Sequence, residues 1–254
     1  MTDLAMTSLK FSTTDKTRTY STSTSFNITV LISGSGTNLQ ALIDACGQAP
    51  STSNKPAPKK TLAHGEITHV ISNRREAKGI ERAQKAHIPV TYHNLVAYKK
   101  KHPATPEGVE AARVQYDVDL AQKILTHIPS PDLVICAGWM HILSHGFVDA
   151  LQRANVKIIN LHPALPGQFD GSNAIGRAFD AFQQGKITKT GVMIHEVITQ
   201  VDAGRPILVR DVEIRKEDTL EDLEERIHQT EWGLIVEATE KVLQLLEQDR
   251  RGSR

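Results

Sequence analysis

The chain has 254 residues, which is long enough for one large domain with a sizeable buried core. Apolar residues make up 39% of the sequence and charged residues 23%, as expected of an ordinary globular protein. With 30 basic and 29 acidic residues the net charge is only +1, so no basic stripe suggests a nucleic-acid partner, and no apolar run is long enough to cross a membrane.

The apolar pattern predicts alternating strands and helices after a polar start. Residues 1–25 are rich in Ser and Thr and are expected to form a flexible tail; a mitochondrial presequence is the alternative, against which Asp3 and Asp15 weigh. The elements then expected, in chain order, are a strand at 27–33, a helix at 38–45, strand 67–72, helix 76–86, strand 88–92, helix 111–125, strand 133–137, helix 144–152, strand 156–160, helix 174–184, strands 191–198 and 207–214, and a helix at 219–247.

The β-α-β-α alternation favours an α/β fold with a mostly parallel, doubly wound sheet, and the hairpin-like end suggests an antiparallel edge. We expect a single domain over residues 26–250, with polar insertions at 47–65 and 93–110. The run Lys99-Lys100-Lys101 in the second insertion is interpreted as a solvated patch. Cys46 and Cys136 lie in apolar segments and are expected to be small core residues in a reducing compartment such as the cytoplasm.

The first strand-to-helix turn reads Ser33-Gly34-Ser35-Gly36-Thr37-Asn38. Glycines let a ligand approach the backbone closely, and a helix start offers free N–H groups to an anion, so a phosphate is the expected guest. A dinucleotide site is the alternative. Its fingerprint is incomplete because Leu39 stands where the third glycine belongs, although Arg74 and Arg75 after the second strand could hold the 2′-phosphate of NADP.

A second motif, Asn160-Leu161-His162-Pro163, ends the strand expected at 156–160. Strand periodicity places Asn160 and His162 on the same side, and Pro163 stops regular pairing just beyond. A carboxamide and an imidazole therefore emerge together at the carboxyl end of a buried strand, where open α/β sheets bind their ligands. Taken alone, the pair also fits an ordinary strand-to-loop turn.

Further motifs follow the same order as in one known enzyme family. The matching pieces are VLISGSGTNLQALIDA at 30–45, SNR at 72–74, PDLV at 131–134, AGWMHIL at 137–143, INLHP at 159–163, DAG at 202–204 and TE at 230–231. Over about residues 28–240 the chain resembles the phosphoribosylglycinamide formyltransferases, folate-dependent enzymes of purine synthesis, in their fungal, single-activity form. The resemblance implies transfer of a formyl group from 10-formyltetrahydrofolate to the amine of glycinamide ribonucleotide, with no metal, by a monomer or weak homodimer.

The resemblance also assigns roles to residues. Amine attack on the formyl carbon builds an oxyanion, so the site needs hydrogen-bond donors and a route for a proton. Asn160 and a charged His162 would supply the donors, and the carboxylate of Asp202 would favour that charge, although Asp202 also fits a plain Asp-x-Gly turn. The ribonucleotide would contact Gly36, Thr37, Asn38, His228, Gln229, Thr230 and Glu231. The folate would contact Arg113, Met140, His141, Ile142, Leu143, Asn160, Ile198, Thr199, Gln200, Val201 and Asp202.

Departures and alternatives accompany this resemblance. Asn173 stands where relatives commonly have a histidine, His141 where an arginine is common, and Glu196 and Thr199 differ from several relatives. Methionyl-tRNA formyltransferase and formyltetrahydrofolate deformylase share the Asn-His-Asp core, but the former carries an extra C-terminal domain and the latter an extra N-terminal one. A nucleotide-binding module without catalysis is the alternative from another class.

Overall fold

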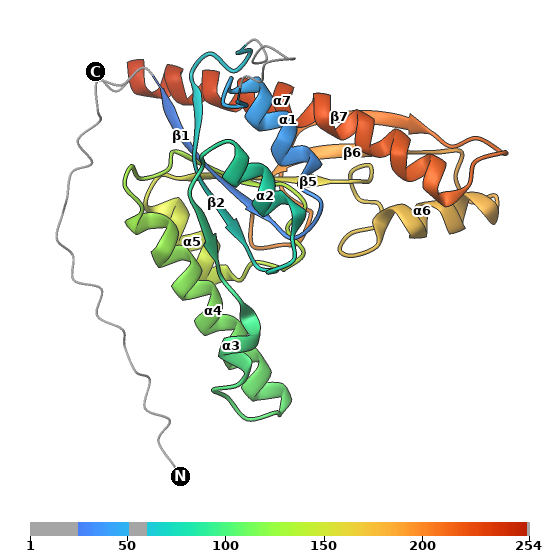
Figure 1. Ribbon diagram of the computed structural model, residues 1–254. Coiled ribbons are helices and arrows are strands. Elements are labelled where there is room, and N and C mark those ends of the chain that lie inside the picture. Colours follow the sequence, from blue (N-terminus) through green and yellow to red (C-terminus); the bar gives the residue numbers. More distant parts are fainter. Residues whose placement is uncertain (1–24, 51–59, 253–254) are drawn as a thin grey trace.

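The computed structural model describes residues 25–50 and 60–252 (Figure 1). The tail expected at 1–25 and the centre of the first expected insertion lie almost entirely outside these residues. Within them the strands form one sheet in the order β3-β2-β1-β4-β5-β6-β7. The strands are β1 (Phe26–Ile32), β2 (Gly65–Ser72), β3 (Val90–Tyr92), β4 (Leu133–Cys136), β5 (Lys157–His162), β6 (Lys189–Glu196) and β7 (Pro206–Glu213).

The sheet has the mixed topology that the sequence predicts. Strands β1 to β5 pair in parallel, whereas β6 runs antiparallel to β5 and β7 antiparallel to β6. The strand order reverses at β1: β2 and β3 follow on one side of it, and β4 and β5 are then added on the other side. The carboxyl ends of β1, β4 and β5 therefore meet at one edge of the sheet, where the crossover leaves a crevice.

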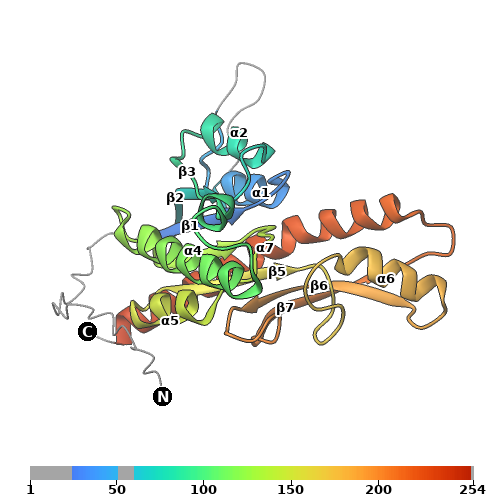
Figure 2. The same ribbon diagram turned by 90° about the horizontal axis from the view of Figure 1, so that it is seen from below.

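Helices cover both faces of the sheet. The helices are α1 (Thr37–Ala45), α2 (Lys78–Lys85), α3 (Leu95–Lys99), α4 (Pro106–Thr126), α5 (His145–Arg153), α6 (Ala174–Gln183) and α7 (Leu220–Gly252). Side chains of β1 alternate between two cores: Val30 and Ile32 pack with α1, α2 and α7, and Leu31 packs with α4 and α5. Figure 2 shows α4 and α5 side by side, away from α1 and α2. This alternation confirms the doubly wound arrangement.

The second expected insertion contains more regular structure than its polar composition suggests. Helix α4 begins at Pro106 rather than at the expected residue 111, because Thr105 caps it by accepting a hydrogen bond from the Gly108 N–H, and proline is favoured in the first turn. The short helix α3 precedes it, with Asn94 as its cap. Helix α7 also extends beyond the expected end at 247, to Gly252.

Two expectations from composition concern the core and the membrane. Cys46 and Cys136 are buried and unpaired, and burial raises the pKa of each thiol to about 12, so neither is a reactive thiolate at neutral pH. Across residues 25–50 and 60–252, no helix is both long and apolar enough to cross a membrane.

Candidate active site

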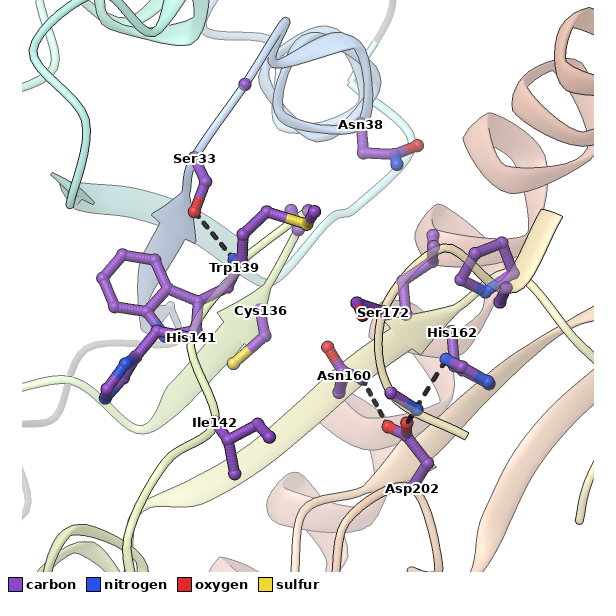
Figure 3. Close-up of a pocket in the computed structure, with 18 of the residues that line it drawn as sticks. Ser33, Asn38, Cys136, Trp139, His141, Ile142, Asn160, His162, Ser172 and Asp202 are labelled. Carbon is purple, nitrogen blue, oxygen red and sulfur yellow. Dashed lines mark hydrogen bonds and ion pairs between the residues drawn. The ribbon is translucent and has the colours of Figure 1, made fainter. Parts of the chain in front are cut away.

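A pocket of about 780 Å³ opens at the carboxyl edge of the sheet (Figure 3). Its walls come from the β1–α1 turn, the segments that follow β4 and β5, the loop between β6 and β7, and one face of α7. The pocket thus lies where the strand order reverses, which is the usual place for a ligand in an open α/β sheet. The expected folate and ribonucleotide residues all line it except Gln229 and Thr230.

Asn160, His162 and Asp202 lie together in this pocket (Figure 3). The Asn160 amide nitrogen is 3.4 Å from one oxygen of Asp202, and His162 Nδ1 is 3.5 Å from the other. The remaining ring nitrogen of His162, Nε2, is 3.4 Å from the carbonyl oxygen of Gln168. Both nitrogens of the buried imidazole therefore face oxygen acceptors, an arrangement that suits the imidazolium form, which donates from both.

The backbone around Asp202 is built to present its carboxylate. Asp202 has a φ of 51°, in the left-handed region that Asp and Asn tolerate better than most residues. A Cβ on Gly204 would lie 1.6 Å from the Glu196 carbonyl oxygen, so only glycine lets the loop close against β6. The carboxylate also accepts the Gly171 N–H at 2.8 Å. Burial alone would raise the pKa of Asp202, but the hydrogen bonds from His195 and Gly171 and the charge of His162 lower it below its ordinary value.

His195 is a buried member of the site that sequence reasoning missed. Strand register places it directly opposite Asn160, and its Nε2 lies 3.1 Å from the Asn160 amide nitrogen and 3.4 Å from an Asp202 oxygen. Its Nδ1 is 2.9 Å from the Glu196 carbonyl oxygen, which can only accept, so Nδ1 carries a proton. Nε2 thus faces the Asn160 amide and the Asp202 carboxylate together, so the ring links these two side chains. The one feature of the sequence that could have identified His195 is its place in the strand that precedes the Asp202 loop.

The glycine turn and the last helix form one end of the pocket. Gly36 caps α1 with a φ of 69°, and a Cβ there would lie 2.4 Å from the Gly79 Cα, so α2 packs directly on the turn. Arg82 of α2 donates to the Ser35 carbonyl oxygen at 3.0 Å and fixes the turn from behind. The free N–H groups of the first turn of α1 thus border the pocket, as a phosphate site requires.

Helix α7 presents only one of its faces to the pocket. Glu224, His228 and Glu231 line the cavity because they are spaced four and three residues apart. Gln229 and Thr230 point elsewhere: Gln229 bonds the Glu225 side chain, and Thr230 bonds the Arg226 carbonyl oxygen. Neither residue lines the pocket, for reasons of helical periodicity, and their contact with the ribonucleotide stays a prediction.

Glu231 is a buried carboxyl group where α7 lines this end of the pocket. It accepts a hydrogen bond of 2.9 Å from the Asn38 amide, yet burial is the larger influence and raises its pKa. A buried carboxyl group with a raised pKa is suited to meet a cationic or N–H-rich ligand, whose approach would stabilise the charge.

Glu231→Gln should therefore raise the stability of the fold and lower its affinity for the ligand. The raised pKa means that the wild-type fold gains stability from neutral Glu231 below about pH 4, the range of an unfolded Glu, and loses it as the pH rises through the folded pKa. The amide has no such penalty, so the variant should melt at a higher temperature than wild type at pH 7.5, with the gap closing toward pH 4. KM for an amine ribonucleotide should rise by about fivefold. A lower melting temperature at pH 7.5 would contradict this account.

The opposite end of the pocket is apolar and partly open. Met140 is 64% exposed and Ile142 54%, and Ile198 and Val201 also line the pocket with exposed apolar surface, so flat apolar ligand surface could be covered here. Two contacts fix this wall: the Met140 N–H donates to Ser33 Oγ at 2.8 Å, and His141 Nε2 lies 2.7 Å from the buried carboxylate of Asp117.

The remaining predicted and divergent positions also find places. Arg113 of α4 also lines the pocket, and Asn173 lines it at the start of α6 with a φ of 54°. Within residues 25–50 and 60–252, the group of donor atoms spaced closely enough for a metal ion comes from His162, Asp170 and Asp202, within 4.8 Å of one another. Asp170 is exposed and lies outside the pocket lining.

Comparisons with known proteins find similar sequences and structures over most of the chain. A family model described as formyl transferase matches residues 26–239. The phosphoribosylglycinamide formyltransferase of Schizosaccharomyces pombe is 50% identical over 219 residues, covering 85% of this chain and 97% of that protein. The protein of the same name from Saccharomyces cerevisiae is 45% identical over 223 residues, covering 86% and 98%. The crystal structure of glycinamide ribonucleotide transformylase 1 from Symbiobacterium toebii superposes with a TM-score of 0.69 at 31% identity, covering 89% and 91%.

Proposed function

The chain belongs to the formyl transferase family, and from this premise we propose that it acts as a phosphoribosylglycinamide formyltransferase. It transfers the formyl group of 10-formyltetrahydrofolate to the amine of glycinamide ribonucleotide in purine biosynthesis. The observation that carries the proposal is the convergence of Asn160, His162 and Asp202 between a glycine turn suited to a phosphate and an apolar wall suited to a pterin. The buried, unpaired cysteines support a location in the reducing cytoplasm. The proposed form of the enzyme is a monomer or a weak homodimer.

Each substrate has an end of the pocket to itself. The ribonucleotide phosphate binds the N–H groups at Gly36, Thr37 and Asn38, and the glycinamide amine reaches Glu231, with His228 beside it. The pterin lies between residues 140–143 and 198–202, and the glutamate of the folate reaches Arg113. The formyl group then lies between the two ends, next to Asn160 and His162.

The chemistry is a direct transfer. The amine nitrogen attacks the formyl carbon, and the carbonyl electron pair moves onto the oxygen. One N–H of Asn160, exchanged from its long contact with Asp202, and the charged ring of His162 stabilise this oxyanion. When the intermediate collapses, the bond from the formyl carbon to the folate nitrogen breaks. The charged ring of His162 gives its proton to that nitrogen and then takes up the proton that the amine loses, so the ring is restored and no net proton is consumed.

His195 acts on Asn160 and not on the substrate. Because its Nε2 lies 3.1 Å from the Asn160 amide nitrogen and 3.4 Å from an Asp202 oxygen, it holds both side chains in place. His195→Ala should lower kcat by about tenfold, the scale of a small misplacement of a reacting group, with both KM values within about threefold of wild type. His195→Gln, whose side-chain amide can form hydrogen bonds in place of Nε2, should recover most of the rate. Equal losses in the two variants would mean that His195 has only a packing role.

One assay tests the function directly. Purified protein is given glycinamide ribonucleotide and 10-formyltetrahydrofolate, and the appearance of tetrahydrofolate is followed together with formylation of the ribonucleotide. Release of free formate without formylated ribonucleotide would instead indicate a deformylase, and formylation of methionyl-tRNA would indicate the other alternative. Stabilisation of the fold by NADPH in a melting experiment would support the dinucleotide alternative.

A further inference from the structure

Three consecutive lysines form an exposed basic cluster near the pocket mouth. We call Lys99, Lys100 and Lys101 the lysine cluster; all three are exposed. Among residues 25–50 and 60–252, none of them forms an ion pair, and the Lys101 ammonium lies 5.6 Å from the centre of the Tyr98 ring. The segment 95–113 holds four basic and two acidic residues, so it stays positive overall. These charges are not needed to hold the fold together.

The cluster is rigidly connected to the folate end of the pocket. Helix α3 begins at Leu95, which lines the pocket, and ends at Lys99, one helical turn or about 6 Å further along. It packs on α4, where Arg113 also lines the pocket, and the Tyr98 hydroxyl donates to Asp119 of α4 at 2.8 Å. Figure 1 shows α3 and the first turns of α4 extending together away from the sheet. The cluster therefore lies just outside the pocket, on the side of Arg113.

We propose that the lysine cluster is a binding site for the oligo-γ-glutamyl tail of the folate substrate. The inference rests on the proposed function, in which the first glutamate of the folate meets Arg113. Each further γ-linked glutamate adds one carboxylate to a flexible chain, which can extend from Arg113 along α3 toward the cluster. A flexible polyanion and three unpaired cations on one rigid protrusion are complementary in charge. Such contacts between exposed charges are individually weak and screened by salt, so they act on affinity for the longer tail.

The test compares two co-substrates on matched variants. Turnover is measured with 10-formyltetrahydrofolate carrying either one or three glutamyl residues, and the ratio of kcat/KM between them is the readout. Lys99, Lys100 and Lys101 are replaced by glutamine together. The control carries three glutamines at Lys85, Lys186 and Lys216, which are exposed and outside the pocket lining, so both variants have the same net charge. Melting temperatures check that both fold.

We expect wild type and the control to favour the triglutamyl substrate by about tenfold at low salt, with the preference falling as salt approaches about 0.5 M. The cluster variant should show a ratio near one. Equal use of both substrates by wild type, or a preference retained in the cluster variant, would overturn the inference, and so would equal loss in the control. Failure of the function itself is recognised separately, because wild type would then not turn over the monoglutamyl substrate either.

Discussion

Replacing Asp202 by asparagine should lower turnover by about two orders of magnitude or more while both substrates still bind. The amide keeps the shape and can still accept the Gly171 N–H, but it removes the negative charge 3.5 Å from His162 Nδ1. His162 then loses the partner that favours its charged form, and with it the stabilisation of the oxyanion. The scale is that of losing a positioned acid-base group. The measurement is kcat at saturating concentrations of both substrates.

Removing His162, Asp202 or both should cause similar losses of turnover. His162→Ala should cost at least as much as Asp202→Asn, and the double variant should cost little more than either, because the carboxylate works only through the imidazole. Asp170→Asn is the matched control: its carboxylate is within 4.8 Å of the same ring but exposed and outside the pocket lining, so its loss should change kcat by less than about threefold. Full additivity of the two losses, or an equal loss in the control, would contradict this mechanism.

The lowered pKa of Asp202 adds a signature in stability. A carboxyl group whose pKa is lower in the folded state stabilises the fold above its unfolded pKa of about 4, and this contribution is lost as the pH falls through the folded value. Wild type should therefore be more stable than Asp202→Asn at neutral pH, and the difference in melting temperature should shrink below about pH 4. A difference that grows toward acid would mean that the carboxylate is not stabilised in the fold.

Gly36→Ala should impair ribonucleotide binding far more than folate binding. Its left-handed φ of 69° disfavours any side chain, and the added Cβ would lie 2.4 Å from the Gly79 Cα, so the turn and α2 must separate. The N–H groups around the phosphate would then move apart. We expect KM for glycinamide ribonucleotide to rise tenfold or more, KM for folate to stay within about twofold, and stability to fall by about 1–3 kcal/mol.

Gly34 provides the control for this change. A Cβ there meets nothing within 4 Å and its φ is not in the left-handed region, although Gly34 lines the same pocket. Gly34→Ala should therefore melt at nearly the wild-type temperature and bind the ribonucleotide much better than Gly36→Ala. Similar defects in the two variants, or equal losses for both substrates in Gly36→Ala, would argue against a phosphate site built from the backbone of this turn.

The sequence predicts those features of the site that depend on local pattern. Asn160 and His162 follow from strand periodicity and a terminating proline, and the turn at Gly36 follows from its glycines. Asp202 does not, because an Asp-x-Gly turn is common; only the resemblance to a family singles it out. His195 depends on the pairing of β6 with β5, where it lies opposite Asn160, and a shift of one residue would put Ile194 there instead. The register between two strands that are distant in sequence depends on both of them and cannot be predicted from either strand alone.

For the fold as well, features that depend on local sequence pattern are predicted, and features that depend on other contacts are missed. Alternating strands and helices, the parallel sheet and the antiparallel edge are all confirmed, since each depends on periodicity within a segment. The start of α4 at Pro106 is missed because the cap formed by Thr105 lies inside a polar stretch with little apolar signal. Gln229 and Thr230 belong to a continuous sequence motif on a helix, where only residues three or four apart share a face, so they do not line the pocket with His228 and Glu231.

The hydrogen bond from Asn38 to Glu231 joins residues 193 positions apart, at the two ends of the folded chain. Contacts between such distant segments form late, since the entropy of closing a long loop must be overcome before they contribute. During synthesis the first five strands can assemble while α7 is still inside the ribosome. The ribonucleotide end of the pocket is complete only when α7 docks against α1. A chain in which α7 is not docked therefore lacks the Glu231 side of the ribonucleotide site, so substrate binding at this end depends on the last segment to be synthesised.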